Sequence, residues 1–219
     1  KPCKNLLCPE NMNRKTILVT GGAKRIGKAI SMKLSSDGFS IAIHYNKSSK
    51  DAFELVETIR SNGGVADAFG ADLNNPEEVS KLIPKIHSVM GNISGIVNNA
   101  SLFSYDDLFS ITEDSWNNHM NINAKSPILL IRDFYSLYDG KNQGSVVNIL
   151  DQKIVNPNPD YLSYTASKFT LLGLTDTLAR SLAPKVRVNA IAPGHTIASP
   201  EQSDSGFSKS QSGSNELCP

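Results

Sequence analysis

Tyr164 and Lys168 are the two residues of this chain whose types and spacing most directly predict proton chemistry. They lie four positions apart at the start of an expected helix, so their side chains share one face. A phenol has a pKa of about 10 and is a weak acid near neutral pH. A fixed ammonium group favours the phenolate, so we expect Lys168 to lower the pKa of Tyr164. The pair can then exchange a proton with a carbonyl, an imine or an alcohol.

A second chemistry-bearing stretch is the glycine-rich run TGGAKRIG at residues 20–27, which follows a short apolar segment. Gly21, Gly22 and Gly27 allow a phosphate to approach the main chain. The following helix directs free N–H groups and a partial positive charge to the same place. The run therefore predicts a diphosphate site, and a tight strand–helix turn without a ligand is the alternative.

Short apolar segments alternate with amphipathic segments along the chain. We expect strands at residues 17–19, 39–44, 65–69, 95–99, 145–150 and 186–192, and helices at 26–36, 50–62, 76–90, 112–137 and 164–183. Uniformly apolar strands are typical of strands buried on both faces. The pattern predicts an α/β fold: a doubly wound parallel sheet with helices on both faces.

In such a sheet, ligands bind beyond the carboxyl ends of the strands. The end of the second expected strand indicates which dinucleotide is bound, because a carboxylate there would hold the ribose hydroxyls of NAD. No acid precedes Asp51 in this segment, whereas Lys47 and Ser48 lie there and Lys24 and Arg25 lie across the glycine turn. This set suits a ribose phosphate and favours NADP(H). A solvated basic loop is the alternative.

The bulk composition narrows the function classes. The chain has 219 residues, 39% hydrophobic content and a net charge of +1, which predict one globular domain without a nucleic-acid or membrane surface. Cys3, Cys8 and Cys218 lie near the two ends and predict free thiols in a reducing, cytoplasmic compartment. The four histidines lack ligand spacing, so we expect no metal site.

Five motifs in order resemble the short-chain dehydrogenase/reductase family: TGGAKRIG, NNA at residues 98–100, NINA containing Asn123, YTASK at 164–168 and APG at 192–194. The resemblance implies a Rossmann-type sheet, a nicotinamide cofactor, a homo-oligomer (a tetramer in the family) and a proton relay through Asn123, Tyr164 and Lys168. It also implies cofactor contacts from Gly21, Lys24, Arg25, Ile26, Gly27, His44, Tyr45, Asn46, Lys47, Ser48, Asp72, Leu73, Asn99, Ala100, Ser101, Tyr164, Lys168, Pro193 and Gly194.

Two departures from the usual family pattern narrow the subfamily. Asp151 stands thirteen residues before Tyr164, where most members have Ser, and Arg25 stands in the glycine turn. With the NNAS segment and Phe103, these features resemble the pteridine reductases and the dihydromonapterin/dihydrofolate reductases. The resemblance implies that substrate is bound by Arg25, Ser101, Phe103, Asp151 and Tyr164.

These substrate residues have a physical rationale. A flat heteroaromatic ring can lie between the nicotinamide and Phe103, while Asp151 hydrogen-bonds ring nitrogens or places a protonating water. The alternatives are a solvent-facing carboxylate for Asp151 and core packing for Phe103.

We therefore expect an NADPH-dependent reductase of a C=N or C=O bond in a pterin- or folate-like small molecule. The alternatives are a general ketone reductase, for example of 3-oxoacyl thioesters, and a dinucleotide-binding protein without turnover. The expected organisation is a flexible arm at 1–14, a cofactor-binding and catalytic domain at 15–196, and a Ser-rich substrate loop or truncated segment at 197–219. The family continues with a further helix and strand, so we expect the sheet to lack the family's last strand.

Overall fold

The structure is a computed structural model that describes residues 14–141, 143–194 and 196. The predictions for the arm before residue 14, for the segment 197–219, for the three cysteines and for His195 lie outside the described residues.

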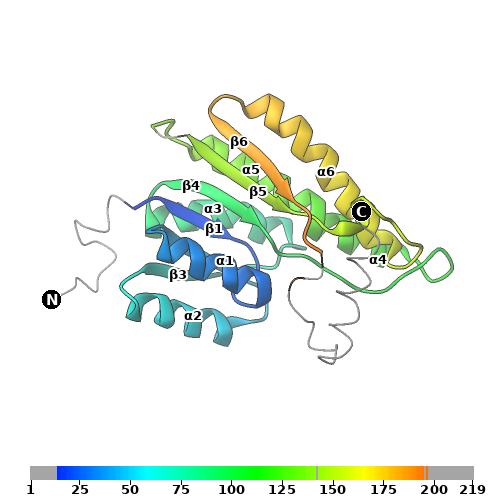
Figure 1. Cartoon of the computed structure of the whole chain (residues 1–219), viewed down its shortest axis with the longest axis horizontal. Helices are drawn as coiled ribbons and strands as arrows, with labels where there is room; N and C mark the ends of the chain where they lie inside the picture. The colour runs from blue at the N-terminus through cyan, green and yellow to red at the C-terminus, as the bar shows by residue number, and fades with distance from the viewer. Residues whose placement is uncertain (1–13, 142, 195, 197–219) are drawn as a thin grey trace.

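In the part of the chain that the structure describes, six parallel strands form one sheet at the centre (Figure 1). Their order in the sheet is β3-β2-β1-β4-β5-β6, which reverses direction between β1 and β4. This is the doubly wound Rossmann arrangement, so the predicted fold class is confirmed. The strands are β1 (Thr16–Val19), β2 (Ser40–Tyr45), β3 (Val65–Gly70), β4 (Ile93–Asn98), β5 (Gly144–Ile149) and β6 (Val186–Ile191).

Helices connect successive strands and cover both faces of the sheet. Asn75 begins one of them, because its side chain accepts a hydrogen bond from the Glu77 N–H and Pro76 follows at the first helical position. The α-helices are α1 (Arg25–Ser36), α2 (Ser49–Ser61), α3 (Pro76–Met90), α4 (Glu113–Met120), α5 (Ser126–Leu137) and α6 (Leu162–Leu182).

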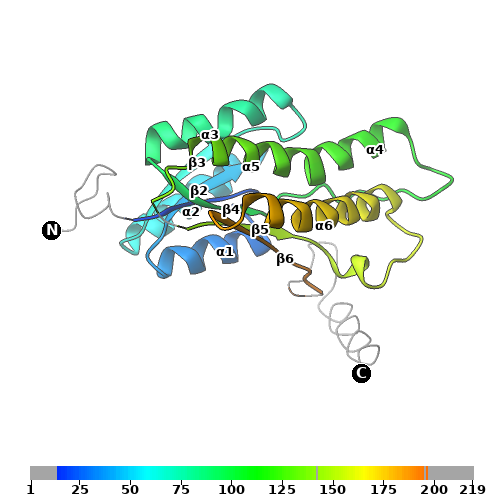
Figure 2. The same cartoon turned by 90° about the horizontal axis from the view of Figure 1, so that it is seen from above.

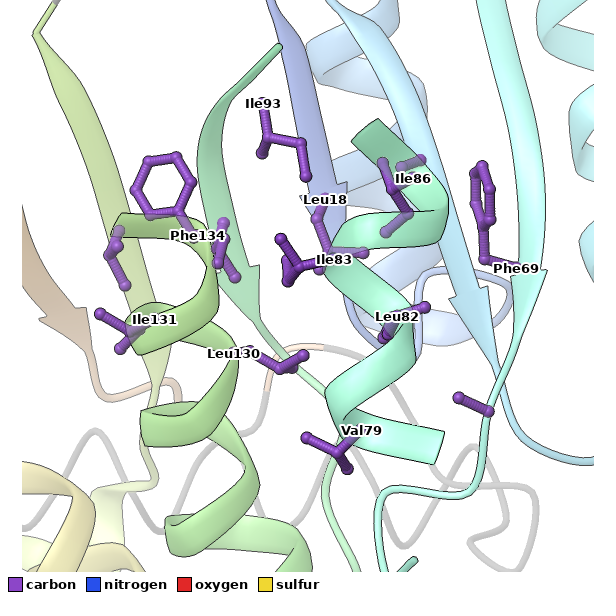
Figure 3. Packing of buried hydrophobic residues seen from close by; sticks show 14 of the residues in the cluster. Leu18, Phe69, Val79, Leu82, Ile83, Ile86, Ile93, Leu130, Ile131 and Phe134 are labelled. Atoms are coloured by element: carbon purple, nitrogen blue, oxygen red, sulfur yellow. The ribbon is translucent and has the colours of Figure 1, made fainter. Parts of the chain in front are cut away.

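One apolar core lies between the sheet and helices α3, α5 and α6 (Figure 3). Leu18 of β1 and Ile96 of β4 face Ile83 of α3, and Phe134 of α5 packs in the same cluster. All four side chains are almost fully buried. Complete burial of such a side chain stabilises the fold by roughly 1.5–3 kcal/mol. This core fixes α6, which carries Tyr164 and Lys168, against the sheet.

A second core covers the opposite face of the sheet under α1 and α2. Ile41 and Ile43 of β2 pack with Leu55 and Ile59 of α2, and Ile30 of α1 lies against the same cluster. Ala42 of β2 belongs to the first core, so this strand has apolar side chains on both faces, as its apolar sequence predicts.

The region predicted as one helix at 112–137 is helical throughout but not uniform. A π-helical segment, Asn121–Lys125, separates α4 from α5, and the three run on as one long rod, of which α4 and the π-helical segment lie beside α6 (Figure 2). The π turn places Asn123 in the interior, where its side chain is fully buried. Single π turns are frequent at functional sites. Apolar periodicity does not distinguish an i→i+5 turn from its α neighbours, so the sequence did not predict it.

Within the described residues, no helix combines the length and apolar character needed to cross a membrane.

Candidate active site

The glycine turn after β1 is locked to the end of β4 by two side chains. The Thr20 hydroxyl accepts hydrogen bonds from the Asn99 and Ala100 N–H groups at 2.9 and 3.0 Å. The Asn99 side-chain amide donates to the Thr20 and Gly21 carbonyls at 2.9 and 3.1 Å. Gly21 itself has a φ of +59°, a conformation that favours glycine. Asn99, predicted as a cofactor contact, therefore holds the shape of the turn.

Gly27 is required where α1 passes over this turn. A Cβ atom there would lie 2.1 Å from the Gly21 carbonyl oxygen and 2.6 Å from the Asn99 amide nitrogen. The start of α1 has no side-chain cap and no acid in its first turn, and its exposed flanking residues are Lys24 and Arg25. Arg25 has a φ of +48°, which is rare for a side-chain-bearing residue. Uncapped amides and two cations suit an anionic group at this helix end.

His44, at the end of β2, lies underneath the turn. Its Nδ1 accepts a hydrogen bond from the Gly21 N–H at 3.1 Å, and its Nε2 donates to the Ala71 carbonyl at 3.0 Å. Burial lowers the pKa of His44 to about 4, against the opposing effects of the Ala71 hydrogen bond and the Asp72 charge. The residue was predicted as a cofactor contact, but its ring is 1% exposed, so it supports the turn from below.

The ends of β2 and β3 form the outer rim of the site. The Asn46 side-chain amide donates to Asp72 at 3.3 Å, while Lys47 is exposed and Ser48 is half-buried. Lys24, expected beside a ribose phosphate, forms an ion pair with Asp51 at 3.0 Å across this rim. The remaining predicted contacts differ in exposure: Leu73 is buried, and Ile26 and Tyr45 are half-buried.

Tyr164, Asp151 and Lys168 meet beyond the end of β5. The Tyr164 hydroxyl donates to Asp151 Oδ2 at 2.7 Å, and Lys168 Nζ donates to the Ile149 carbonyl at 2.8 Å. Lys168 Nζ also lies 5.5 Å from the centre of the Tyr164 ring. The structure thus brings together the predicted pair and Asp151, and the solvent-facing alternative for Asp151 is wrong.

The predicted direction of the Tyr164 pKa is also wrong. Burial, the Asp151 charge and the hydrogen bond to Asp151 together raise the pKa of this phenol, and they outweigh a hydrogen bond with Ser101. Burial lowers the pKa of Lys168 to about 8, although Asp151 opposes the shift. The prediction rested on the Lys168 ammonium alone, whereas burial and the Asp151 carboxylate stabilise the protonated phenol.

Asn123 ties the segment after β4 to α6. Its side-chain oxygen accepts from the Leu102 N–H at 2.7 Å and from the Ser101 hydroxyl at 3.3 Å. Its amide nitrogen donates to the Leu102 carbonyl at 3.0 Å and to the Ser167 hydroxyl at 2.9 Å. Asn123 is therefore linked to Tyr164 through Ser167, whose hydroxyl donates to the Tyr164 carbonyl at 2.6 Å, and it orders the segment that carries Ser101 and Phe103.

Phe103 is 54% exposed, so the core-packing alternative for it is wrong. One face of its ring stacks on Tyr161, with centroids 4.2 Å apart and planes inclined by 11°. The Phe103 and Tyr164 rings meet in a T-shaped contact, with centroids 4.7 Å apart at an interplanar angle of 84°. These rings form an aromatic wall beside the Tyr164 phenol.

The chain after β6 closes the other side. The Pro193 carbonyl accepts a hydrogen bond from the Gln152 N–H at 3.2 Å, next to Asp151. A Cβ at Gly194 would lie 3.2 Å from the Gln152 side chain. The predicted site residues from all six strand ends thus lie along one edge of the sheet.

Two buried polar residues beside the site were not singled out from the sequence: Asp106 and His119. Asp106 lies in the irregular segment after β4, which gives no periodic signal, and His119 is a lone buried polar residue on α4. Among the described residues, no group of three His, Cys, Asp or Glu side chains is arranged to hold a metal ion.

Comparison with known proteins identifies the family. The profile of short chain dehydrogenases matches residues 15–205. The chain belongs to the short-chain dehydrogenase/reductase family. A curated relative, 3-oxoacyl-[acyl-carrier-protein] reductase FabG of Staphylococcus epidermidis, is 30% identical over 185 residues, which cover 84% of this chain and 76% of the relative.

Two solved structures superpose well on this chain. FolM alternative dihydrofolate reductase 1 from Brucella canis, complexed with NADP, has a TM-score of 0.85 and 40% identity, with coverage of 90% of this chain and 78% of that one. A blue fluorescent protein from a metagenomic library, in complex with NADPH, has a TM-score of 0.81 and 32% identity, with coverage of 90% and 81%.

The close approach at Gly27 yields a stability prediction. Gly27→Ala forces the Gly21 backbone to move, and we expect it to lower the free energy of unfolding by about 1–3 kcal/mol or more. Gly173→Ala is the matched control, because this glycine is also helical and a Cβ there meets nothing within 4 Å. We expect the control to raise stability by about 0.5–1 kcal/mol. Urea unfolding measures both, and equal effects would contradict the packing described here.

The burial of His44 yields a pH prediction. Its folded pKa of about 4 lies below the ordinary value of 6.5, so the unfolded chain binds the proton first as pH falls. The stability that neutral His44 contributes is therefore complete above pH 6.5 and is lost as the pH falls from 6.5 to 4. We expect His44→Gln to remove a slope of at most about 1.4 kcal/mol per pH unit. Parallel pH–stability curves for the two proteins would refute this.

Proposed function

We propose that this protein is an NADPH-dependent reductase of a C=N or C=O bond in a pterin- or folate-like molecule. The observation that carries the proposal is the 2.7 Å hydrogen bond from the Tyr164 hydroxyl to Asp151. A carboxylate paired with the proton-donating phenol suits a substrate rich in ring nitrogens, because a carboxylate accepts hydrogen bonds from ring N–H groups. The likeness to FolM alternative dihydrofolate reductase 1 supports the same substrate class.

The residues present fit NADP(H). The glycine turn and the uncapped start of α1 supply amides for a diphosphate. The end of β2 has no carboxylate before Asp51 that would repel a ribose phosphate. Lys47 and Arg25 are exposed cations on this rim. We infer that the diphosphate lies at Gly21–Gly27, that Lys47 and Ser48 meet the ribose phosphate, and that Asp72, Ala100 and Pro193 flank the adenine and nicotinamide halves.

NADPH supplies a hydride to the substrate carbon when it is bound. Tyr164 holds the proton that the reduced substrate needs in addition to the hydride, because a phenol with a raised pKa is fully protonated at neutral pH. When the phenol gives up this proton, the Lys168 ammonium beside the ring stabilises the phenolate. Asp151 orients the phenol and accepts hydrogen bonds from substrate N–H groups. Asn123 holds Ser101 and Leu102 in register with α6.

The aromatic wall determines which substrate shape fits the site. The exposed part of the Phe103 ring offers a flat apolar surface beside the Tyr164 hydroxyl. Ser101 is exposed at the same edge and offers a hydrogen-bonding hydroxyl. We assign Arg25, which is exposed at the glycine turn, to the cofactor phosphate and the substrate, as the subfamily resemblance implies. A flat heteroaromatic ring satisfies all three, since stacking and edge contacts both favour it.

A second candidate is a reductase of 3-oxoacyl thioesters. It is favoured by the 30% identity to 3-oxoacyl-[acyl-carrier-protein] reductase FabG. Asp151 argues against it, because a ketone oxygen needs hydrogen-bond donors, whereas an ionised carboxylate only accepts.

We further propose that the protein acts as a homo-oligomer in the cytoplasm. Exposed large apolar side chains lie on the long helical rod and on α6, and surfaces of this kind commonly mark contacts between proteins. They are Trp116, Tyr135, Leu137, Phe169 and Leu172.

The functional prediction concerns both substrate and proton donor. We expect the protein to oxidise NADPH with a 7,8-dihydropterin faster than with a 3-oxoacyl thioester. Tyr164→Phe should lower kcat by about 100-fold or more while the Kd for NADPH stays near the wild-type value, because only the proton donor is lost. Tyr138→Phe, a tyrosine at the C-terminal end of α5 and outside the site, is the control and should retain full activity.

Full activity of Tyr164→Phe would overturn the assigned role of the phenol. A preference for the thioester would show that the protein is the second candidate, a reductase of 3-oxoacyl thioesters. Tight NADPH binding without turnover of any substrate would show a dinucleotide-binding protein instead.

A further inference from the structure

The helix that carries Tyr164 and Lys168 is held at its start by a residue from another segment. Tyr161 is the N-cap of α6 but has a left-handed backbone and makes no capping hydrogen bond with its side chain. The first amides of a helix have no intrahelical partner. Asp106, in the segment after β4, meets two of them. Its backbone carbonyl accepts from the Leu162 N–H at 3.1 Å, and its Oδ1 accepts from the Ser163 N–H at 2.9 Å.

The second carboxylate oxygen of Asp106 reaches a different helix. Its Oδ2 accepts a hydrogen bond from the Ser115 hydroxyl at 2.9 Å. Ser115 belongs to the capping box that begins α4, together with Thr112. One carboxylate therefore connects the starts of α4 and α6, which lie side by side (Figure 2).

The environment of Asp106 indicates that the charge is retained in the folded protein. The residue is 2% exposed, and burial alone would raise its pKa. The hydrogen bonds from Ser163 and Ser115 outweigh burial, so the pKa of Asp106 lies below its ordinary value. A negative charge at the N-terminus of a long helix is also stabilised by the helix dipole.

Neighbouring contacts keep this segment in place. His119 is completely buried, its Nδ1 lies 2.7 Å from the Ser115 carbonyl, and its Nε2 lies 3.3 Å from the Ser104 N–H. These contacts fix the segment that carries Asp106, and Asp106 in turn caps α6. A fixed acceptor, rather than a mobile one, determines where the first turn of α6 lies.

We propose that Asp106 is a positioning residue for the reduction: by capping α6 from outside, it sets the place of the Tyr164 phenol relative to Asp151. This inference rests on the proposed function. Tyr164 directly follows Ser163, so loss of the cap frees the turn that carries the phenol. A misplacement of about 1 Å at a reacting group can lower a rate about 100-fold. Lys168 is one turn further on and is anchored separately by the Ile149 carbonyl.

Three variants separate positioning from folding. Asp106→Leu removes both side-chain acceptors at nearly the same size but keeps the backbone bond to Leu162. Asp106→Asn keeps a neutral acceptor for Ser163. Asp107→Asn is the matched control, because Asp107 accepts hydrogen bonds from Ser110, Phe109 and Tyr105 within its own loop.

The measurements are kcat with a 7,8-dihydropterin, the Kd for NADPH, and hydrogen–deuterium exchange of residues 162–165. For Asp106→Leu we expect kcat to fall about tenfold or more and exchange to accelerate at least about tenfold, with the Kd for NADPH within about twofold of wild type. Asp106→Asn should retain kcat within about threefold, because the Ser163 acceptor survives. Asp107→Asn should match the wild type in all three.

Wild-type kcat and exchange in Asp106→Leu would overturn the proposal. Equal losses of kcat and NADPH affinity would also overturn it, since they would show general damage to the fold. If the wild-type protein reduces none of the substrates, the proposed function fails, and exchange at residues 162–165 with the NADPH Kd still decides whether Asp106 positions the turn.

Discussion

All six strands of the sheet run in the same direction, and this constraint determines where the chemistry lies. Parallel strands bring their carboxyl ends to one edge, so residues distant in sequence meet there. Asp151 follows β5, the glycine turn follows β1, and α6 returns across the same edge with Tyr164. The 2.7 Å hydrogen bond between the Tyr164 hydroxyl and Asp151 exists only because this topology aligns the end of β5 with the first turn of α6.

Much of the site consists of polar groups that support other polar groups. His44 accepts from the Gly21 amide below the cofactor turn, and Thr20 and Asn99 bind the turn to the end of β4. Asn123, inside the π turn, orders the segment that presents Ser101 and Phe103. Each of these side chains is hydrogen-bonded, which avoids the cost of an unpaired polar atom at these positions and favours a single arrangement. Such a rim is rigid before substrate arrives.

The sequence predicted the fold closely because its strands and helices have clear apolar periods, and every predicted boundary lies within two residues of the observed one. It also predicted the meeting of Tyr164, Lys168 and Asp151. It did not predict the raised pKa of Tyr164, which depends on burial and on the direction of the Asp151 carboxylate. The role of His44 beneath the turn, the π turn at Asn123 and the cap from Asp106 depend on contacts between distant segments, which spacing along the chain does not reveal.

The central claim is that Asp151 beside the Tyr164 phenol selects a nitrogen-rich ring over a simple ketone. Its most direct test is the ratio of kcat/KM for a 7,8-dihydropterin to kcat/KM for a 3-oxoacyl thioester, compared between the wild-type protein and Asp151→Ser. A serine hydroxyl can donate to a ketone oxygen but accepts hydrogen bonds from ring N–H groups more weakly than a carboxylate. We expect the loss of this selection by Asp151 to lower the ratio by about 100-fold in the variant. An unchanged ratio would contradict it.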